Sequence, residues 1–262
     1  MVAQNALLAA IKTYMDRVLC LKATGVDDID SQLRSAKEDA MKQLIGHKPN
    51  AGLVNGHVND LRETLSKSGK CFVELKFRTA RKFISGWSPL YFITEAPMSW
   101  DMILDVPYIE GSTIKGILRD FFMEVVKEST GDSSSAEKMT NCVFGSSEGV
   151  GKVIFFNAYP VSSDEILTYD IITPHYPNAE TEYDVEPVPV KFLTIKEGVE
   201  FVTFLAFDKT ELTNACGTTA LNYLLKALLL SMKVGWGRRT TRGYGEFELA
   251  TEGVKLKCPG SN

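Results

Sequence analysis

Near the end of the chain, eleven residues combine the features of a loop that binds a polyanion. Residues 235–245 hold four glycines, three arginines and two aromatic rings, and no acidic side chain. Glycine permits tight turns, while arginine and aromatic side chains offer cations and flat faces. This combination predicts contact with RNA or single-stranded DNA through phosphates and stacked bases. The predicted RNA-binding residues are Gly235, Trp236, Gly237, Arg238, Arg239, Arg242, Gly243 and Tyr244.

The same segment also fits a glycine-rich turn between a helix and a strand, with its arginines simply exposed to water. For Trp236 and Tyr244, packing beside a sheet is as good an interpretation as base stacking. The residue types of the loop do not decide between these alternatives.

The distribution of charge favours the nucleic-acid interpretation. The chain has 29 Lys+Arg against 33 Asp+Glu, so its net charge of -4 provides no overall attraction to RNA. Segments 76–82 and 233–242 nevertheless hold eight of the cations and no carboxylate. A positive surface on an otherwise acidic chain is typical of a local groove. The first segment supplies a secondary basic patch of Lys76, Arg78, Arg81 and Lys82.

A second candidate site lies at 107–119, where a Gly-Ser-Thr sequence precedes a helical pattern. Ser112 or Thr113 is predicted to cap this helix. The free N–H groups of its first turn favour a phosphate, and Lys115 and Arg119 supply neutralising charge. The plain alternative is an ordinary capped helix with solvated Lys115 and Arg119.

The glycine-rich segment 145–152 resembles a nucleotide-binding P-loop only superficially. Serine occupies position 146 where the P-loop needs glycine, and Val153 replaces the metal-binding Ser/Thr. We therefore expect a turn that enters a strand.

Metal and catalytic signatures are weak, so no metal, no cofactor and no catalytic residue is predicted. The three histidines show no metal-ligand spacing, and the five scattered cysteines form no CxxC motif, which makes a disulfide framework unexpected. An alternative hypothesis is a ribonuclease that uses Asp101, Asp105 or His175 for acid–base chemistry. Loop carboxylates are usually solvated, and a lone histidine is usually structural.

Length and composition predict a globular chain with a full core. The 262 residues are 44% hydrophobic, and the longest apolar run, 227–230, is far too short to span a membrane. With no export signal in the first residues, a cytoplasmic location is the expectation.

The elements that position these segments follow from periodicity. Helices are predicted over 3–22, 29–45 and 57–68, with a break at 49–52, and a half-buried strand begins at Cys71. The later predictions are a helix from 112 to about 128, a short helix, a strand run over 153–161, a proline-rich loop or edge hairpin over 173–190, a strand over 199–207, a helix over 212–232 and a strand over 243–249.

The order strand, helix, strand, strand, helix, strand predicts an α+β fold with a ferredoxin-like (RRM-like) βαββαβ core, insertions and an N-terminal helical extension. Two helices are expected to cover one face of the sheet and to leave the other for a ligand. The predicted divisions are a helical extension over 1–70, the core over 71–252 and a tail over 253–262.

Three motifs in order resemble the RAMP superfamily of CRISPR-Cas proteins: the helix start at 108–116, the Val-Phe-Gly step at 143–145 and the late arginine loop. The segments 170–176, 187–190 and 192–195 narrow the resemblance to the sixth-subunit family of type III-B Cmr effector complexes. The resemblance covers about residues 71–250.

The resemblance implies an RRM-like core, binding of the guide RNA toward its 3′ end, and contact with target RNA and other RAMP subunits at one end of a filament. It assigns guide contacts to Ser112, Thr113, Lys115, Arg119 and the loop 235–245. It also implies that a repeated backbone subunit cuts target RNA, so we expect this chain to be non-catalytic. A third hypothesis is a scaffold whose basic patches bind acidic protein partners.

Overall fold

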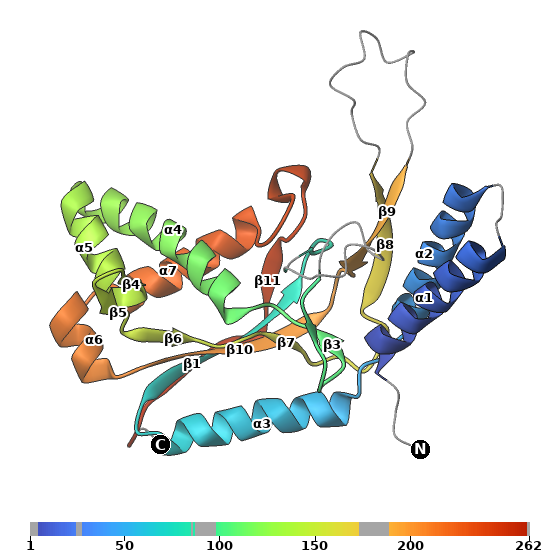
Figure 1. Ribbon diagram of the computed structural model, residues 1–262. Helices are drawn as coiled ribbons and strands as arrows, with labels where there is room; N and C mark the ends of the chain where they lie inside the picture. Colours follow the sequence, from blue (N-terminus) through green and yellow to red (C-terminus); the bar gives the residue numbers. More distant parts are fainter. Residues whose placement is uncertain (1–4, 25–27, 85, 87–97, 173–188, 261–262) are drawn as a thin grey trace, which may run out of the picture.

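The computed structural model describes residues 5–24, 28–84, 86, 98–172 and 189–260 (Figure 1). Within those residues, no helix combines the length and apolar content needed to cross a bilayer. The helices are α1 (Ala6–Thr24), α2 (Ile29–Ile45), α3 (Ala51–Lys67), α4 (Gly111–Thr130), α5 (Ser133–Phe144), α6 (Lys209–Cys216) and α7 (Ala220–Val234). The strands are β1 (Cys71–Thr79), β2 (Trp100–Asp101), β3 (Val106–Pro107), β4 (Gly145–Ser146), β5 (Gly149–Val150), β6 (Val153–Phe155), β7 (Tyr159–Pro160), β8 (Leu167–Ile172), β9 (Val190–Ile195), β10 (Glu200–Phe207) and β11 (Phe247–Lys257).

The centre of the molecule is a five-stranded antiparallel sheet. Its strands lie in the order β11-β1-β10-β6, and β7 also pairs with β10. Val73 of the central strand β1 faces Leu205 on one side and Leu256 on the other. Helices α4 and α7 lie side by side over one face of this sheet (Figure 1). The prediction of a mixed α+β fold is confirmed.

The main core lies between the sheet and these two helices. Along β1, Val73, Leu75 and Phe77 point toward the helices, because successive strand residues point to opposite faces. Along α4, fully buried apolar residues recur every four positions, which places them on one side of the helix. They are Ile114, Leu118 and Phe122.

Helix α3 covers part of the second face of the sheet, although the sequence pattern predicts that this face is open to a ligand (Figure 1). Val54 and Val58 of α3 are buried against Phe72 of β1 and Phe204 of β10. The expectation is wrong here because the strands are apolar on both faces, and the second face needs its own cover.

An ion pair fastens α3 to this face. Two nitrogens of Arg62 donate to the Glu74 carboxylate at 2.9 and 2.7 Å, and both residues are half-buried. The hydrogen bonds from Arg62 hold the pKa of the Glu74 carboxyl below its ordinary value, although burial opposes them. Glu74 is therefore ionised at neutral pH and retains the contact.

We expect Glu74→Gln to lower the free energy of unfolding by about 1–2 kcal/mol at pH 7, because it removes a charged hydrogen-bond pair. Since the folded pKa of Glu74 lies below its ordinary 4.5, the contribution is complete above that pH and is lost as pH falls through the folded pKa. Denaturant titrations of both proteins between pH 3 and 7 should show the difference shrinking at acid pH. The control is Glu63→Gln, which removes the exposed ion pair between Glu63 and Lys67 on the same helix. A pH-independent difference would contradict the prediction.

Three predicted boundaries are corrected. The helix predicted over 212–232 divides into α6 and α7 at Gly217, whose φ of +96° is not helical. The predicted break at 49–52 contains the start of α3, because the Asn50 side chain accepts a hydrogen bond from Leu53 N–H and caps the helix. Strand β11 continues to Lys257 and pairs with β1, so part of the predicted tail belongs to the sheet.

The N-terminal helices also join the core. Leu7 and Ala10 of α1 are buried in the same apolar cluster as the sheet and α4. The N-terminus of α1 is capped by Asp105, whose carboxylate accepts from Ala6 N–H at 3.1 and 2.9 Å. Contacts with the core thus hold α1 at its first turn and along its buried face.

Two disulfides are present, so the prediction from cysteine spacing that no disulfide framework forms is wrong. Cys71 of β1 is bonded to Cys258 just after β11, and Cys142 of α5 is bonded to Cys216 of α6. Cys20 is exposed and unpaired. The partners are 187 and 74 residues apart in the sequence, so only the folded chain brings them together.

Candidate nucleic-acid interface

The glycine-rich loop between α7 and β11 is held on a fixed backbone frame. Its two ends meet where Trp236 N–H donates to the carbonyl oxygen of Gly245 at 2.8 Å. The segment after β1 extends the frame, because Gly245 N–H donates to Lys82 O at 2.8 Å and Arg238 N–H donates to Ile84 O at 2.9 Å. The loop therefore has a defined shape even though it contains little regular structure.

Three of the four glycines in the loop have a positive φ and a neighbouring backbone atom too close for a Cβ atom, and the overlap is greatest at Gly237 and Gly245. Gly237 has a φ of +84°, and a Cβ atom there would overlap the carbonyl oxygen of Ile84. Gly245 has a φ of +78°, and a Cβ atom there would overlap the carbonyl oxygen of Trp236. Both positions combine a left-handed backbone with no room for a side chain, which only glycine satisfies.

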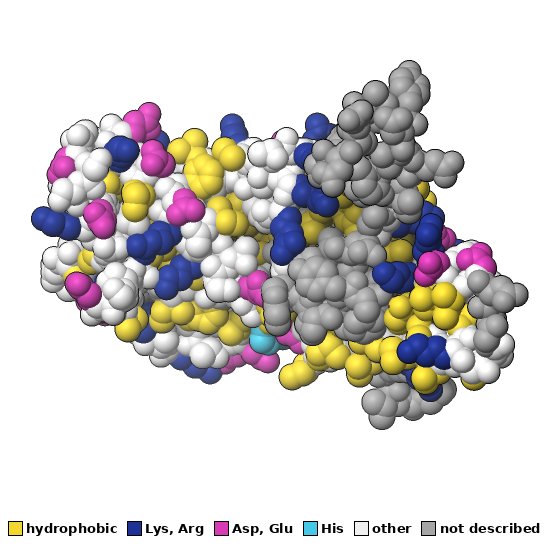
Figure 2. Space-filling view, turned by 45° about the horizontal axis from the view of Figure 1, so that its top comes forward, with side chains coloured by type: hydrophobic (Ala, Val, Ile, Leu, Met, Phe, Trp, Pro, Cys, Tyr) yellow, Lys and Arg dark blue, Asp and Glu magenta, His cyan; other side chains and the backbone are white. Residues whose placement is uncertain are grey.

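The three arginines of the loop project into solvent. Arg238, Arg239 and Arg242 are all exposed, and none forms an ion pair with a described carboxylate. Arg239 has a φ of +63°, a strained conformation for a residue other than glycine. Its guanidinium carbon lies 5.4 Å from the centre of the Phe192 ring in β9, a cation–π contact. In the view of Figure 2, several lysine and arginine side chains lie near the middle of the molecule, and others lie toward its two ends.

Asp170 of β8 ties the loop to the neighbouring hairpin. Its carboxylate accepts hydrogen bonds from the Tyr244 hydroxyl at 2.7 Å and from Lys82 Nζ at 2.9 Å. Burial raises the pKa of Asp170, but these hydrogen bonds outweigh it and hold the pKa below its ordinary value. Burial and the bond to Asp170 raise the pKa of Tyr244 to about 12. The contact therefore has a carboxylate and a neutral phenol at physiological pH.

The structure corrects the role predicted for Trp236. Its side chain is 0% exposed, and its ring packs against Phe77 and Phe247 in the main core. The indole Nε1–H donates to Ser231 Oγ at 3.0 Å. Trp236 is a core residue and is not placed to stack a base, whereas Tyr244 is only half-buried beside the loop.

The secondary basic patch divides between two surfaces. Arg81 and Lys82 follow β1 and lie next to the glycine-rich loop, since Gly245 bonds to this segment. Lys76 and Arg78 instead alternate toward the face on which α3 packs, and both meet carboxylates. These ion pairs are Lys76–Glu200 at 3.7 Å and Arg78–Glu248 at 2.5 Å.

The helix motif starts differently from the prediction. Neither Ser112 nor Thr113 caps α4, because the N-cap residue is Glu110. The Gly111 N–H donates to Asn157 Oδ1 at 2.8 Å, and the Thr113 hydroxyl donates to the Glu110 carboxylate at 3.0 Å. Of the two predicted capping side chains, Ser112 is exposed and Thr113 is half-buried.

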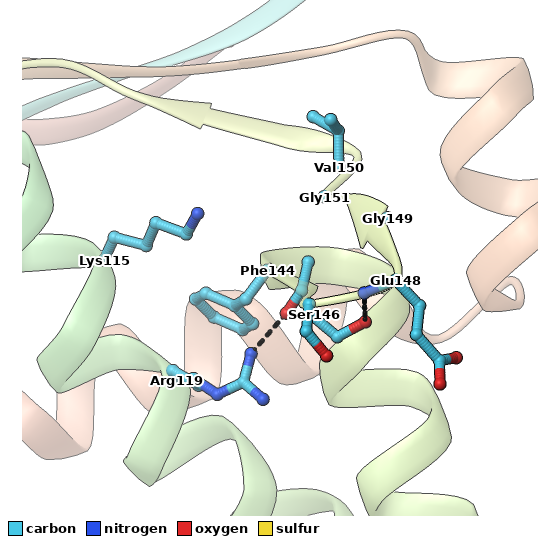
Figure 3. Close-up of a pocket in the computed structure, with 10 residues that line it drawn as sticks. Lys115, Arg119, Phe144, Ser146, Glu148, Gly149, Val150 and Gly151 are labelled. Carbon is cyan, nitrogen blue, oxygen red and sulfur yellow. Dashed lines mark hydrogen bonds between the residues drawn. The ribbon is translucent and has the colours of Figure 1, made fainter.

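Lys115 and Arg119 line an open hollow of about 570 Å³ between α4 and the β4–β5 hairpin (Figure 3). Arg119 donates to Gly145 O and Asn141 Oδ1, each at 2.6 Å, so the hairpin and α5 direct its guanidinium. Lys115 forms no ion pair with a described carboxylate, and the Glu148 side chain points away from it in Figure 3. The expected turn at 145–152 is confirmed as this hairpin.

The hollow and the arginine loop occupy different parts of the molecule. In Figure 1, β4 and β5 lie at the left, near α5 and α6, whereas the loop before β11 lies toward β8 and β9. The structure therefore brings Arg81, Lys82 and the loop arginines together, but it does not join them with Lys115 and Arg119.

Of the three residues in the ribonuclease hypothesis, Asp101 and Asp105 are described, and both carboxylates form hydrogen bonds within the fold. Asp101 accepts hydrogen bonds from Ile103 N–H, from Leu104 N–H and from the Tyr159 hydroxyl. Burial raises the pKa of Tyr159 to about 12, so this phenol remains a donor at neutral pH.

Asp105 is engaged as well, since it caps α1 and accepts from Trp100 Nε1 at 3.0 Å. His175 lies outside the described residues. Among the residues that are described, no group of three or more His, Cys, Asp or Glu side chains is arranged to hold a metal ion.

Sequence reasoning missed the support that Asp170 and Phe192 give to the loop. Both residues lie in strands far from the loop along the chain, and neither carries a local signal of that role. The pairing of β8 with β9 and the bridge from Phe83 to Ile195 bring them there.

Comparison with known proteins places the chain in a family. A family model for the RAMP superfamily matches residues 95–248, more than half of the chain, so the chain belongs to this superfamily. Within it the chain is similar to Cmr6 proteins. It is 31% identical over 200 residues to CRISPR system CMR subunit Cmr6 of Saccharolobus solfataricus, a match that covers 75% of this chain and 64% of the relative.

Two further similarities are to proteins of the same kind. Cmr6 of Pyrococcus furiosus is 31% identical over 120 residues, which are 40% of this chain and 33% of that protein. The match thus spans less than two thirds of either relative. A chain in the cryo-EM structure of a type III-B Cmr-beta complex bound to cognate target RNA superimposes with a TM-score of 0.72 at 26% identity, covering 88% of this chain and 76% of that chain.

Proposed function

We propose that this chain is a non-catalytic, guide-RNA-binding terminal subunit of a type III-B CRISPR (Cmr) RNA-targeting effector complex, with a role in antiviral defence. The observation that carries the proposal is the set of three exposed arginines on one rigid loop, Arg238, Arg239 and Arg242. A fixed loop positions cations without a large entropic cost on binding, and RNA phosphates are the ligand that arginine forks match.

We include a ferredoxin-like core in the proposal. Along the chain the order is β1, α4, β6, β10, α7 and β11, and in the sheet the order is β11-β1-β10-β6. This is the split βαβ arrangement, in which each helix connects strands that are not neighbours. Because α3 packs on the second face, we place the RNA on the loop and the α4 side rather than on the sheet itself.

Two surfaces would contact the RNA backbone. The loop arginines neutralise successive phosphates, and Tyr244 is the one aromatic ring of the loop at the surface. Lys115 and Arg119 form a second cationic site in the hollow beside α4. About four phosphate contacts give a log–log salt slope near -3 for a single strand.

The absence of catalysis is supported by the uses of the candidate carboxylates. Asp101 organises the β2–β3 turn, and Asp105 caps α1, so neither is a free base beside the cationic surface. In the proposed complex the partners of this chain are guide RNA, target RNA and other RAMP subunits, and its location is the cytoplasm.

The test measures how tightly the purified chain binds a fluorescently labelled single-stranded RNA of about 30 nucleotides. Fluorescence anisotropy reports the binding at several salt concentrations. We expect tight binding with a slope near -3 and, on a denaturing gel, an uncut RNA. Cleavage that Asp101→Asn abolishes would favour the ribonuclease alternative. Salt-independent or undetectable binding would favour a protein scaffold and reject the proposal.

A further inference from the structure

The wall of the hollow opposite α4 is built around the end of α5. Here the helix runs directly into the β4–β5 hairpin, and Arg119 donates to Asn141 Oδ1 and to Gly145 O at 2.6 Å each. These two acceptors flank Cys142 and Phe144 in the sequence. The direction of the Arg119 guanidinium therefore depends on where residues 141–145 are held.

The same residues are fastened from the other side to α6. Cys142 is disulfide-bonded to Cys216, the last residue of α6. Lys152, just after the hairpin, donates its N–H to Cys142 O at 3.1 Å and its ammonium to Glu211 Oε1 at 2.6 Å. The Lys152–Glu211 pair is partly exposed and contributes little by itself. The covalent bond is the stronger of these links between the wall and α6.

We infer that the Cys142–Cys216 disulfide positions the wall of the hollow, so that its reduction weakens RNA binding through Lys115 and Arg119. This inference rests on the proposed function. The residues that line the hollow come from α4, from the end of α5 and from the segment 145–151. Of the two disulfides, this one holds a residue of α5 two positions before the lining residue Phe144. The bond thus acts on binding through Arg119 rather than by touching RNA.

The redox step requires a dithiol reductant. One thiolate of the dithiol attacks the Sγ atom of Cys142, which is half-buried whereas Cys216 is buried, and Cys216 leaves as a thiolate that takes up a proton. The second thiol of the reductant then displaces Cys142 as a thiol and closes the oxidised dithiol. Two electrons and two protons pass to the protein, and α5 and α6 are left joined by noncovalent contacts only.

The second disulfide provides a matched control. Cys71–Cys258 joins the start of β1 to the end of β11, and none of these elements lines the hollow. Loss of either bond lowers stability, because each closes a long loop in the unfolded chain. Only loss of Cys142–Cys216 is expected to change the hollow.

The experiment compares the wild type, Cys142→Ser/Cys216→Ser and Cys71→Ser/Cys258→Ser, each with and without dithiothreitol. The readouts are affinity for a labelled single-stranded RNA, thermal midpoint, and amide hydrogen exchange over residues 141–152. Reduction of the wild type should weaken RNA binding about tenfold, comparable to removal of one charge-assisted hydrogen bond, and should reduce the salt slope by about 0.7. The Cys142/Cys216 variant should bind weakly under both conditions, whereas the Cys71/Cys258 variant should keep the response to reductant.

Amide hydrogen exchange over residues 141–152 should become faster when the wild type is reduced. This measurement requires neither RNA nor a variant. Unchanged exchange and affinity on reduction would overturn the inference, as would equal losses of affinity in the two variants, which would indicate a general loss of stability. If exchange rises but oxidised protein does not bind RNA, the proposed function fails while the positioning of the wall stands.

Discussion

Replacing Arg238, Arg239 and Arg242 together with alanine is expected to weaken binding to single-stranded RNA about a hundredfold at roughly 0.1 M salt. The log–log salt slope should become shallower by about 2, since each phosphate contact on a single strand contributes about 0.7. Both quantities are measured in one anisotropy series over a range of salt concentrations.

The physical reason is that these guanidinium groups are exposed and form no ion pair with a described carboxylate. A phosphate is then a new partner rather than a replacement for an internal one. Stability should change little, because the substitutions mainly remove the cation–π interaction of Arg239 with Phe192, worth about 1 kcal/mol or less at an exposed site. Thermal unfolding of the triple variant checks this point.

The matched control removes the same number of cations from the other side of the sheet. Lys76→Ala/Arg78→Ala/Lys255→Ala changes three residues that already pair with carboxylates of the chain. We expect its RNA affinity to stay within about threefold of the wild type, since paired surface charges contribute little. Equal losses in the two triple variants would show that only net charge matters and would reject the loop as the site.

Trp236→Ala is expected to lower the free energy of unfolding by about 3–5 kcal/mol, the largest effect on stability that we predict. Trp236→Phe should cost only about 1–2 kcal/mol and should bind RNA as the wild type does. Urea titrations followed by circular dichroism measure the first quantity, and anisotropy measures the second.

The large cost follows from complete burial. The indole is 0% exposed, lies about 5 Å from the ring centres of Phe77 and Phe247, and donates to Ser231. Alanine leaves a cavity and removes the hydrogen bond that the Ser231 hydroxyl accepts, although this hydroxyl still donates to Leu228 O. Phenylalanine refills most of the volume and loses only that hydrogen bond.

Ser231→Ala removes that hydrogen bond together with the one that the Ser231 hydroxyl donates to Leu228 O at 2.8 Å, and it leaves the buried indole N–H without its partner. We expect it to lower the free energy of unfolding by about 1–3 kcal/mol. A Trp236→Ala variant with wild-type stability but weakened RNA binding would contradict the core assignment and restore base stacking. The interpretation of Trp236 as a stacking platform is wrong for a reason that composition alone does not reveal: the loop doubles back so that its second residue faces inward.

Features with a local cause were predictable from the sequence. The alternation of Val73, Leu75 and Phe77 predicts β1, and four-residue spacing predicts α4, because strand and helix geometry repeat over neighbouring residues. The mixed α+β architecture followed from the order of such segments. Gly237 and Gly245 were recognisable as turn residues for the same local reason, since positive φ is a property of one residue.

The tertiary structure alone decided which of the predicted cations are available to a ligand. Lys76 and Arg78 resemble the loop arginines in sequence, but strand pairing brings them into ion pairs with Glu200 and Glu248 on the neighbouring strands. It likewise decided that α3 packs on the second face, that Trp236 faces the core, and that the cysteines pair across 187 and 74 residues. Periodicity acts between neighbours in the chain, whereas burial and charge pairing depend on residues that become neighbours only when the sheet and helices pack.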